Sequence, residues 1–265
     1  MAGGGPQNIF EIVNLDDSSP FLVCDNISAL PGHATSAIAF LYNKITPISC
    51  KLGGLCYSYE DSIWKDGPKH PWQCDHSVTF SSFTERINKK NQDIVLLHCG
   101  QYNSTVFSFD GMQWSTGVYA NLPVHIRDNC MVRINDLMVM VMGGYKHSPS
   151  GYMAGDSYFF NVIENKWIIG PQLMKTRGSP VCGVMSWKNN KVIVVAGGYE
   201  LNPSADVPLK SVEFLFFNDF DNSNVSWVEG PSLPYFIEGT ALVEFDNGVI
   251  LVGGQEITKY GETRL

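Results

Sequence analysis

Apolar runs that end on two glycines recur along this chain. The segment VILVGGQE, residues 249–256, follows the pattern, and so do VMVMGGYK at 139–146 and VIVVAGGYE at 192–200. Short runs of β-branched and aliphatic residues bounded by glycine are typical of buried strands. The recurrence predicts a repeated structural unit rather than one isolated motif.

Each unit is predicted to contain four short strands. Between residues 127 and 170 these are the alternating CMVRIND, the apolar LMVMVMGG, the aromatic DSYFFNVIE and the closing NKWIIGP. The same order indicates repeats at 30–66, 76–117, 127–170 and 179–230, with partial repeats at 1–20 and 238–265. A tryptophan marks the fourth strand of each complete repeat, namely Trp64, Trp114, Trp167 and Trp227.

This pattern resembles the kelch repeat, which has a period of about 50 residues and four strands per propeller blade. The resemblance covers nearly the whole chain, although its first two repeats are degenerate. It rests on glycine pairs that are followed, several times along the chain, by an aromatic strand and a tryptophan. The paired glycines are Gly53, Gly54, Gly143, Gly144, Gly197, Gly198, Gly253 and Gly254.

The resemblance implies an all-β fold, a single kelch-type β-propeller domain over residues 1–265. Glycine is needed where strands crowd the channel and the backbone turns sharply, and each tryptophan is expected to fill the wedge between neighbouring blades. About four complete blades and two partial ones are expected. The ring has five blades if the partial ones join, and six or more if the chain is incomplete, which is the expectation we favour.

Charge narrows the range of partners. The chain has a net charge of −8, and 17% of its residues are charged. It therefore has no excess of basic residues to neutralise nucleic acid or anionic lipid, and we expect neither as a partner. No signal peptide or membrane-spanning segment is visible in the sequence, and the compartment stays open.

The seven cysteines show none of the short spacings that zinc fingers use. Cys50 and Cys56 can face each other across a hairpin, either as buried thiols or as a disulfide in an oxidising compartment. Cys99, Cys130 and Cys182 lie in apolar segments and are interpreted as thiols that fill the core.

No catalytic pattern is present in the sequence. It contains no G-x-S-x-G or H-E-x-x-H motif, and its Gly-rich start precedes a strand rather than a helix that could hold phosphate. We therefore expect no enzyme activity, no metal site and no cofactor.

With no catalytic pattern found, the remaining candidate for a functional site is a binding surface. In kelch propellers, the loops after the glycine pairs and those opening the first strands gather on one face and commonly bind a partner. Carried over to this chain, the candidate partner-binding residues are Gln101, Tyr145, Tyr199, Gln255, Ser77, Arg127, Arg177 and Glu238. The sequence thus favours a non-catalytic module that binds a protein or peptide; the alternative is a carbohydrate-active enzyme of the kelch-like propeller type.

Overall fold

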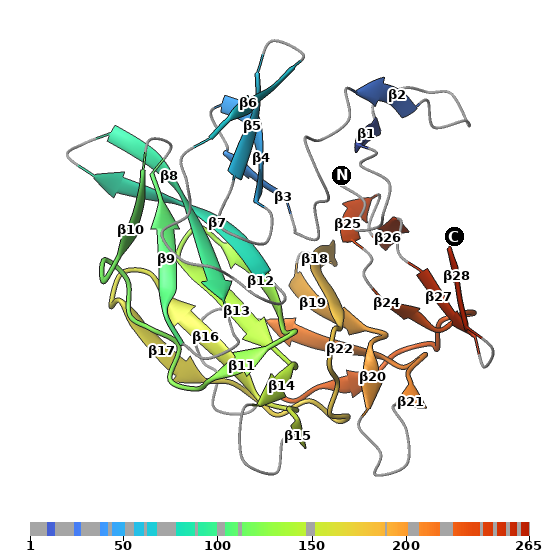
Figure 1. Ribbon diagram of the computed structural model, residues 1–265. Coiled ribbons are helices and arrows are strands. Elements are labelled where there is room, and N and C mark those ends of the chain that lie inside the picture. Colours follow the sequence, from blue (N-terminus) through green and yellow to red (C-terminus); the bar gives the residue numbers. More distant parts are fainter. Residues whose placement is uncertain are drawn as a thin grey trace.

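The structure is a computed structural model, and all of its regular elements are β-strands (Figure 1). It describes residues 10–13, 24–27, 38–41, 44–50, 56–60, 63–67, 78–87, 90–99, 104–110, 113–146, 152–188, 190–200, 207–217, 225–238, 241–245, 248–252, 255–258 and 261–264. The expectation of an all-β fold is confirmed. Over the described residues there is no helix with the length and apolar character needed to cross a bilayer.

Four sheets each contain four antiparallel strands. The first is built from β3 (Ile38–Leu41), β4 (Lys44–Cys50), β5 (Cys56–Glu60) and β6 (Ile63–Asp66), and the second from β7 (Val78–Ile87), β8 (Lys90–Cys99), β9 (Val106–Phe109) and β10 (Trp114–Thr116). The third contains β12 (Cys130–Asn135), β13 (Met138–Met142), β16 (Ser157–Asn161) and β17 (Lys166–Ile169). The fourth contains β18 (Val181–Trp187), β19 (Asn190–Ala196), β22 (Val212–Phe217) and β23 (Val228–Glu229).

The remaining strands form smaller sheets. Two pairs lie toward the ends of the chain: β1 (Phe10–Val13) with β2 (Cys24–Ile27), and β25 (Ala241–Phe245) with β26 (Gly248–Val252). Three more small sheets lie between or after the larger ones in sequence. One contains β11 (Ile126–Arg127), β14 (Tyr145–Lys146) and β15 (Tyr152–Met153), and the second contains β20 (Tyr199–Glu200) and β21 (Val207–Pro208). The third contains β24 (Ile237–Glu238), β27 (Gln255–Thr258) and β28 (Gly261–Arg264). The sequence pattern did not predict these three.

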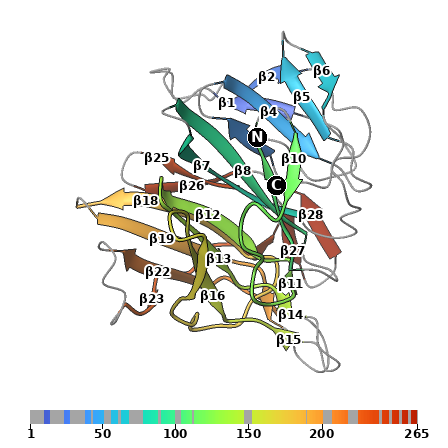
Figure 2. The ribbon, with the colours of Figure 1, turned by 90° about the vertical axis from the view of Figure 1, so that its left-hand side faces the viewer.

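The second, third and fourth sheets and the pair β25–β26 pack face to face in chain order (Figures 1 and 2). Strand β13 shows why its sequence is apolar throughout, since all five residues are buried. Val139 and Val141 face a cluster with residues of β8 and β9, while Met138, Met140 and Met142 face the side chains of β19 and β22. A strand buried on both faces reads as a continuous apolar run, because alternation requires one face in water.

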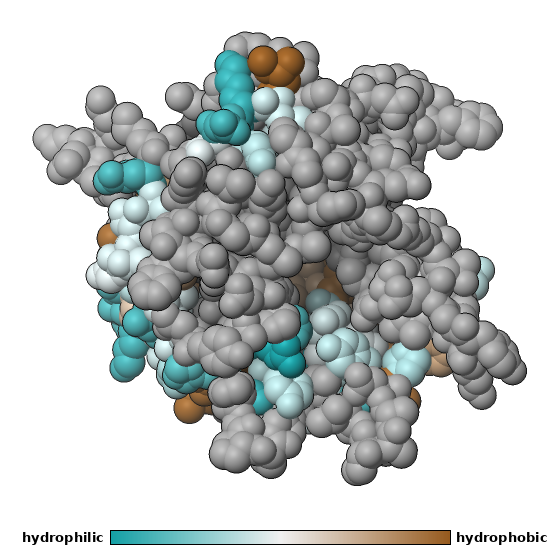
Figure 3. All heavy atoms as spheres, viewed as in Figure 1, coloured by the Kyte–Doolittle hydropathy of each residue, from teal (hydrophilic) through white to brown (hydrophobic). Residues whose placement is uncertain are grey.

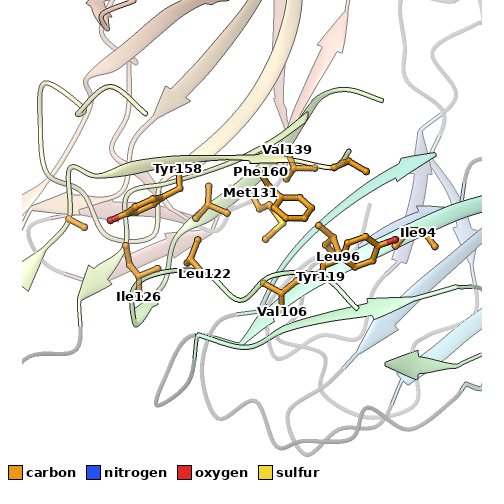
Figure 4. Packing of buried hydrophobic residues seen from close by; sticks show 13 residues of the cluster. Ile94, Leu96, Val106, Tyr119, Leu122, Ile126, Met131, Val139, Tyr158 and Phe160 are labelled. Atoms are coloured by element: carbon orange, nitrogen blue, oxygen red, sulfur yellow. The ribbon is translucent and has the colours of Figure 1, made fainter. Parts of the chain in front are cut away.

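The first of these clusters occupies the space between the second and third sheets (Figure 4). Leu96 and Val106 come from one sheet, and Val139 and Phe160 come from the other; all four are at most 2% exposed. Burying each such aliphatic or aromatic side chain contributes on the order of 2 kcal/mol before ordering entropy is subtracted. The interface between sheets is therefore the hydrophobic core of this protein.

Two of the predicted tryptophans also pack between sheets. Trp167 lies against the cluster between the second and third sheets, and its ring N–H donates to the carbonyl of Ala120 at 2.8 Å. Trp227 is 5% exposed between the third and fourth sheets and donates to the carbonyl of Pro171 at 3.0 Å. Trp64 in β6 and Trp114 in β10 are partly buried.

The glycine pairs link one sheet to the start of the next. Gly143, Gly144, Gly197 and Gly198 all have positive φ, between 60° and 103°. The N–H of Gly144 donates to the carbonyl of Arg177 at 2.7 Å, and that of Gly198 donates to the carbonyl of Ile237 at 3.1 Å. A Cβ at Gly144 would lie 2.5 Å from the carbonyl oxygen of Arg127, so both conformation and space require glycine here. The predicted pairs Gly53–Gly54 and Gly253–Gly254 lie outside the described residues.

Candidate functional site

The three small sheets collect the chain segments that follow the glycine pairs and those that open the first strands. Two of them lie along the lower part of Figure 1, where β11, β14, β15, β20 and β21 are labelled, and the third, with β24, β27 and β28, lies on the right of that view. Figure 3 shows that the described residues over β14 and β20 are coloured from teal to nearly white. We call the described residues of these segments the loop surface: 123–128, 145–146, 152–156, 174–178, 199–200, 207–210 and 234–238.

Several predicted site residues are neighbours on the loop surface. Arg127 and Tyr145 are register partners in β11 and β14, and the guanidinium carbon of Arg127 lies 4.7 Å from the centre of the Tyr145 ring. Glu238 and Gln255 are backbone partners in β24 and β27. The structure thus pairs a residue that opens a first strand with a residue that follows a glycine pair. Gln101 and Ser77 lie outside the described residues.

Tyr199 follows the same pairing rule, with Gly178 at the position that Arg127 holds in the preceding repeat. It bridges to Gly178, where the N–H of Gly178 donates to the Tyr199 carbonyl at 2.8 Å and the N–H of Tyr199 donates back at 3.0 Å. The Tyr199 side chain is partly exposed, as is that of Tyr145. Both tyrosines can therefore contribute ring surface to a partner.

Arg177 corrects the sequence prediction, because it cannot be a surface binding residue. Its side chain is completely buried and forms an ion pair with the buried Glu213, with Nη2 and Oε1 separated by 2.5 Å. Nη1 donates to the carbonyls of Gly197 and Ser211 at 2.9 and 3.1 Å, and Nη2 donates to the Ser211 hydroxyl at 3.0 Å. Arg177 therefore holds the fourth sheet together from inside.

Burial lowers the pKa of Arg177 from its ordinary value, while the charge and hydrogen bond of Glu213 oppose that shift. The guanidinium remains protonated at neutral pH because its pKa starts far above that range. Glu213 also accepts the backbone N–H groups of Met174 and Lys175 at 2.7 and 3.1 Å. One carboxylate thus fixes the segment that leads into the fourth sheet.

The third sheet has an apolar pair at the matching positions. Counted from the residue before each glycine pair, Ile126 corresponds to Arg177 and Tyr158 corresponds to Glu213. Ile126 and Tyr158 belong to one buried cluster and lie near each other, beside Leu122, in Figure 4. The same location in the repeat can therefore be filled by apolar contact or by an ion pair.

Next to these positions the backbone adopts a left-handed conformation at residues other than glycine. Asp128 has a φ of 53° and Ser179 a φ of 47°, and they hold matching positions in the third and fourth sheets. The N–H of Ser179 donates to the carbonyl of Asp128 at 2.8 Å. Such residues cost on the order of 1–3 kcal/mol each and persist when surrounding contacts enforce them. The loop surface is thus held in a defined shape.

Sequence reasoning missed several residues of the loop surface. Thr176 donates its hydroxyl to Glu200 at 3.1 Å, and Lys146 forms an ion pair with Asp156 at 2.5 Å. The ammonium of Lys210 lies 4.6 Å from the centre of the Phe236 ring and donates to the carbonyl of Pro234 at 2.7 Å. Tyr235, which lies between Pro234 and Phe236 in the sequence, is 50% exposed. The aromatic segment PYFIE before the last repeat was the available signal.

Cys130 and Cys182 belong to the core between the third and fourth sheets, as expected, but the expectation that they are free thiols is wrong. They form a disulfide whose Cα atoms are 6.0 Å apart, and it joins β12 to β18. The bond lies a few residues beyond the hydrogen bond between Asp128 and Ser179, so the same two segments are linked twice. Cys50 and Cys56 are backbone partners across β4 and β5, as the hairpin prediction requires. Cys99 lies at the end of β8, where it is the backbone partner of Val78 in β7.

No cluster of three or more His, Cys, Asp or Glu side chains that could hold a metal occurs among the described residues. The chemistry visible on the loop surface is therefore that of aromatic rings, cations stacked on them, and charged groups with partners nearby.

Comparison with known proteins gives a shared fold. No family model and no curated protein matches the chain. The structure is similar to the solved structure described as "Structure of YjhT", with a TM-score of 0.68 and 12% sequence identity over 98% of this chain and 91% of that chain. In all, 223 chains of solved structures match. A fold found this widely does not assign a function, which must come from the site.

Proposed function

We propose that this chain is a kelch-type β-propeller that acts as a non-catalytic binding module for a protein or peptide. The partner would bind at the loop surface, around the mouth of the propeller channel. The propeller assignment is supported by four-stranded sheets that pack face to face in chain order. It is also supported by glycine pairs that repeat the same positive φ and the same bond to the next sheet.

The observation that carries the binding proposal is the repeated contact between two classes of loop. Arg127 meets Tyr145, Thr176 meets Glu200, and Lys210 meets Phe236. Each contact joins a segment on the glycine-pair side to a segment that leads into a first strand. These contacts fix aromatic rings at the surface before any partner arrives, which lowers the entropy lost on binding. Aromatic residues and arginine also dominate the energetics of protein interfaces.

An affinity pull-down tests this proposal. Tagged protein is incubated with an extract of the source cells, and captured proteins are quantified by mass spectrometry for the wild type and the double variant Tyr145→Ala/Tyr199→Ala. We expect at least one partner whose recovery falls by about tenfold or more, because each lost ring at the centre of an interface typically costs over 1 kcal/mol.

The matched control is Ile169→Ala, which removes an 82% exposed side chain from the outermost strand of the third sheet. This variant should recover the partner as the wild type does. Capture of no specific partner, or of partners that respond equally to both changes, would count against the proposal.

A further inference from the structure

Six charged side chains on the described loop surface are already engaged within the chain. The Nε of Arg127 lies 3.7 Å from a carboxylate oxygen of Asp128, and Lys146 pairs with Asp156. Glu200 accepts the hydroxyl of Thr176. A partner that bound through ion pairs would have to compete with these contacts or pay to desolvate both sets of charges.

The ammonium of Lys210 is held in the same way. It donates to the Pro234 carbonyl and lies over the Phe236 ring. The cation covers one face of that ring, as Arg127 covers one face of Tyr145. A cation stacked on a ring holds the ring in place, and the same cation is then less able to form an ion pair with a partner. What the surface offers outward is aromatic and apolar area, including Tyr235 at 50% and Met174 at 57% exposure.

The net charge of this surface also differs from that of the chain. Four cations, Arg127, Lys146, Lys175 and Lys210, offset four anions, Asp128, Asp156, Glu200 and Glu238, while the buried Arg177 is neutralised by Glu213. The whole chain carries −8. A nearly neutral patch on an acidic protein neither steers a basic partner toward it nor attracts an acidic one strongly.

From this charge balance we infer that the partner segment is uncharged and is recognised through aromatic and apolar contacts rather than ion pairs. This inference rests on the proposed function, and it adds the chemical class of the partner. Candidate segments are rich in proline, aliphatic or aromatic residues, because such side chains stack on fixed rings without needing a counter-charge.

Selection from a random peptide library displayed on phage tests the inference. The wild-type protein is the target, and the enriched pool is then screened against Tyr145→Ala/Tyr235→Ala and against the control Ile169→Ala. We expect enriched peptides with no net charge whose binding falls about tenfold or more with the first variant and is unchanged with the second. Equal urea midpoints for all proteins establish that the variants are folded.

Two further readouts separate aromatic recognition from ionic recognition. The affinity of the most enriched peptide should change less than about threefold between about 0.05 and 0.5 M NaCl, since no exposed charge pair is screened. Lys175→Met, which removes an exposed cation from the loop surface and none of the contacts that fix the rings, should bind within about threefold of the wild type.

Each other outcome is decisive. Enriched peptides with acidic or basic clusters, whose binding falls at high salt or with Lys175→Met, would overturn the inference and leave the proposed function standing. If no enriched peptide depends on Tyr145 and Tyr235, both the inference and the proposed loop surface fail.

Discussion

Removing one partner of the Arg177–Glu213 pair should strongly destabilise the protein. Both groups are buried, at 0% and 1% exposure, so Arg177→Met leaves a carboxylate in the core without its cation. Breaking a buried pair in this way typically costs about 3–5 kcal/mol. We expect a fall of this size in the free energy of unfolding, measured by urea denaturation followed through tryptophan fluorescence. Glu213→Gln should cost a comparable amount, because it strands the guanidinium instead.

The preceding sheet suggests a rescue. In the double variant Arg177→Ile/Glu213→Tyr, the fourth sheet receives the apolar pair that Ile126 and Tyr158 provide in the third. Replacing a buried ion pair with packed apolar side chains is often neutral or stabilising. Two backbone N–H groups still lose the carboxylate that accepts them, so a residual cost of about 1–2 kcal/mol is expected. The double variant should therefore be more stable than either single variant.

The control is the ion pair between Lys146 and Asp156, whose side chains are 20% and 29% exposed. Lys146→Met should cost about 1 kcal/mol or less, since water and salt screen a partly exposed pair. The reasoning is refuted if Arg177→Met costs no more than this control, or if the double variant is as unstable as the sum of its single changes.

Three further perturbations probe the fold. Gly144→Ala should cost at least about 2 kcal/mol of unfolding free energy, because its φ is 103° and the new Cβ meets backbone atoms. The control Gly117→Ala, where the new Cβ meets open space, should cost about 1 kcal/mol. A similar loss for both variants would contradict the crowding argument. Cys130→Ser/Cys182→Ser should lower the free energy by about 4 kcal/mol, given a sequence separation of 52 residues, and thiol counting on unfolded, unreduced wild-type protein should find these two cysteines blocked. Trp227→Phe should cost about 1–2 kcal/mol, from the lost ring N–H bond and a smaller ring, and an unchanged urea midpoint would argue against its packing role.

The strands of the four large sheets could be predicted because their signals are local. The apolar run at Met138–Met142 and the glycines that follow it report burial on both faces and a sharp turn, and both depend only on neighbouring residues. The strands β11 and β14 contain two residues each, too few for any periodicity to appear. Their pairing depends on the larger sheets having already brought their ends together.

The role of Arg177 could not be predicted in this way. Its position at the start of a repeat suggested exposure, but its burial depends on Glu213, which is 36 residues away in sequence. The disulfide between Cys130 and Cys182 likewise requires two sheets to be neighbours at the right separation. Spacing along the chain determines neither arrangement, because both depend on residues that only the folded structure brings together.

Hydrogen exchange on the protein with and without its captured partner tests the central claim most directly. The account predicts that partner binding slows exchange in peptides covering Tyr145–Lys146, Tyr199–Glu200 and residues 234–238, with little change in β17 and β23 on the outer edges of their sheets. Slowed exchange confined to β17 and β23, with the loop surface unaffected, would contradict it.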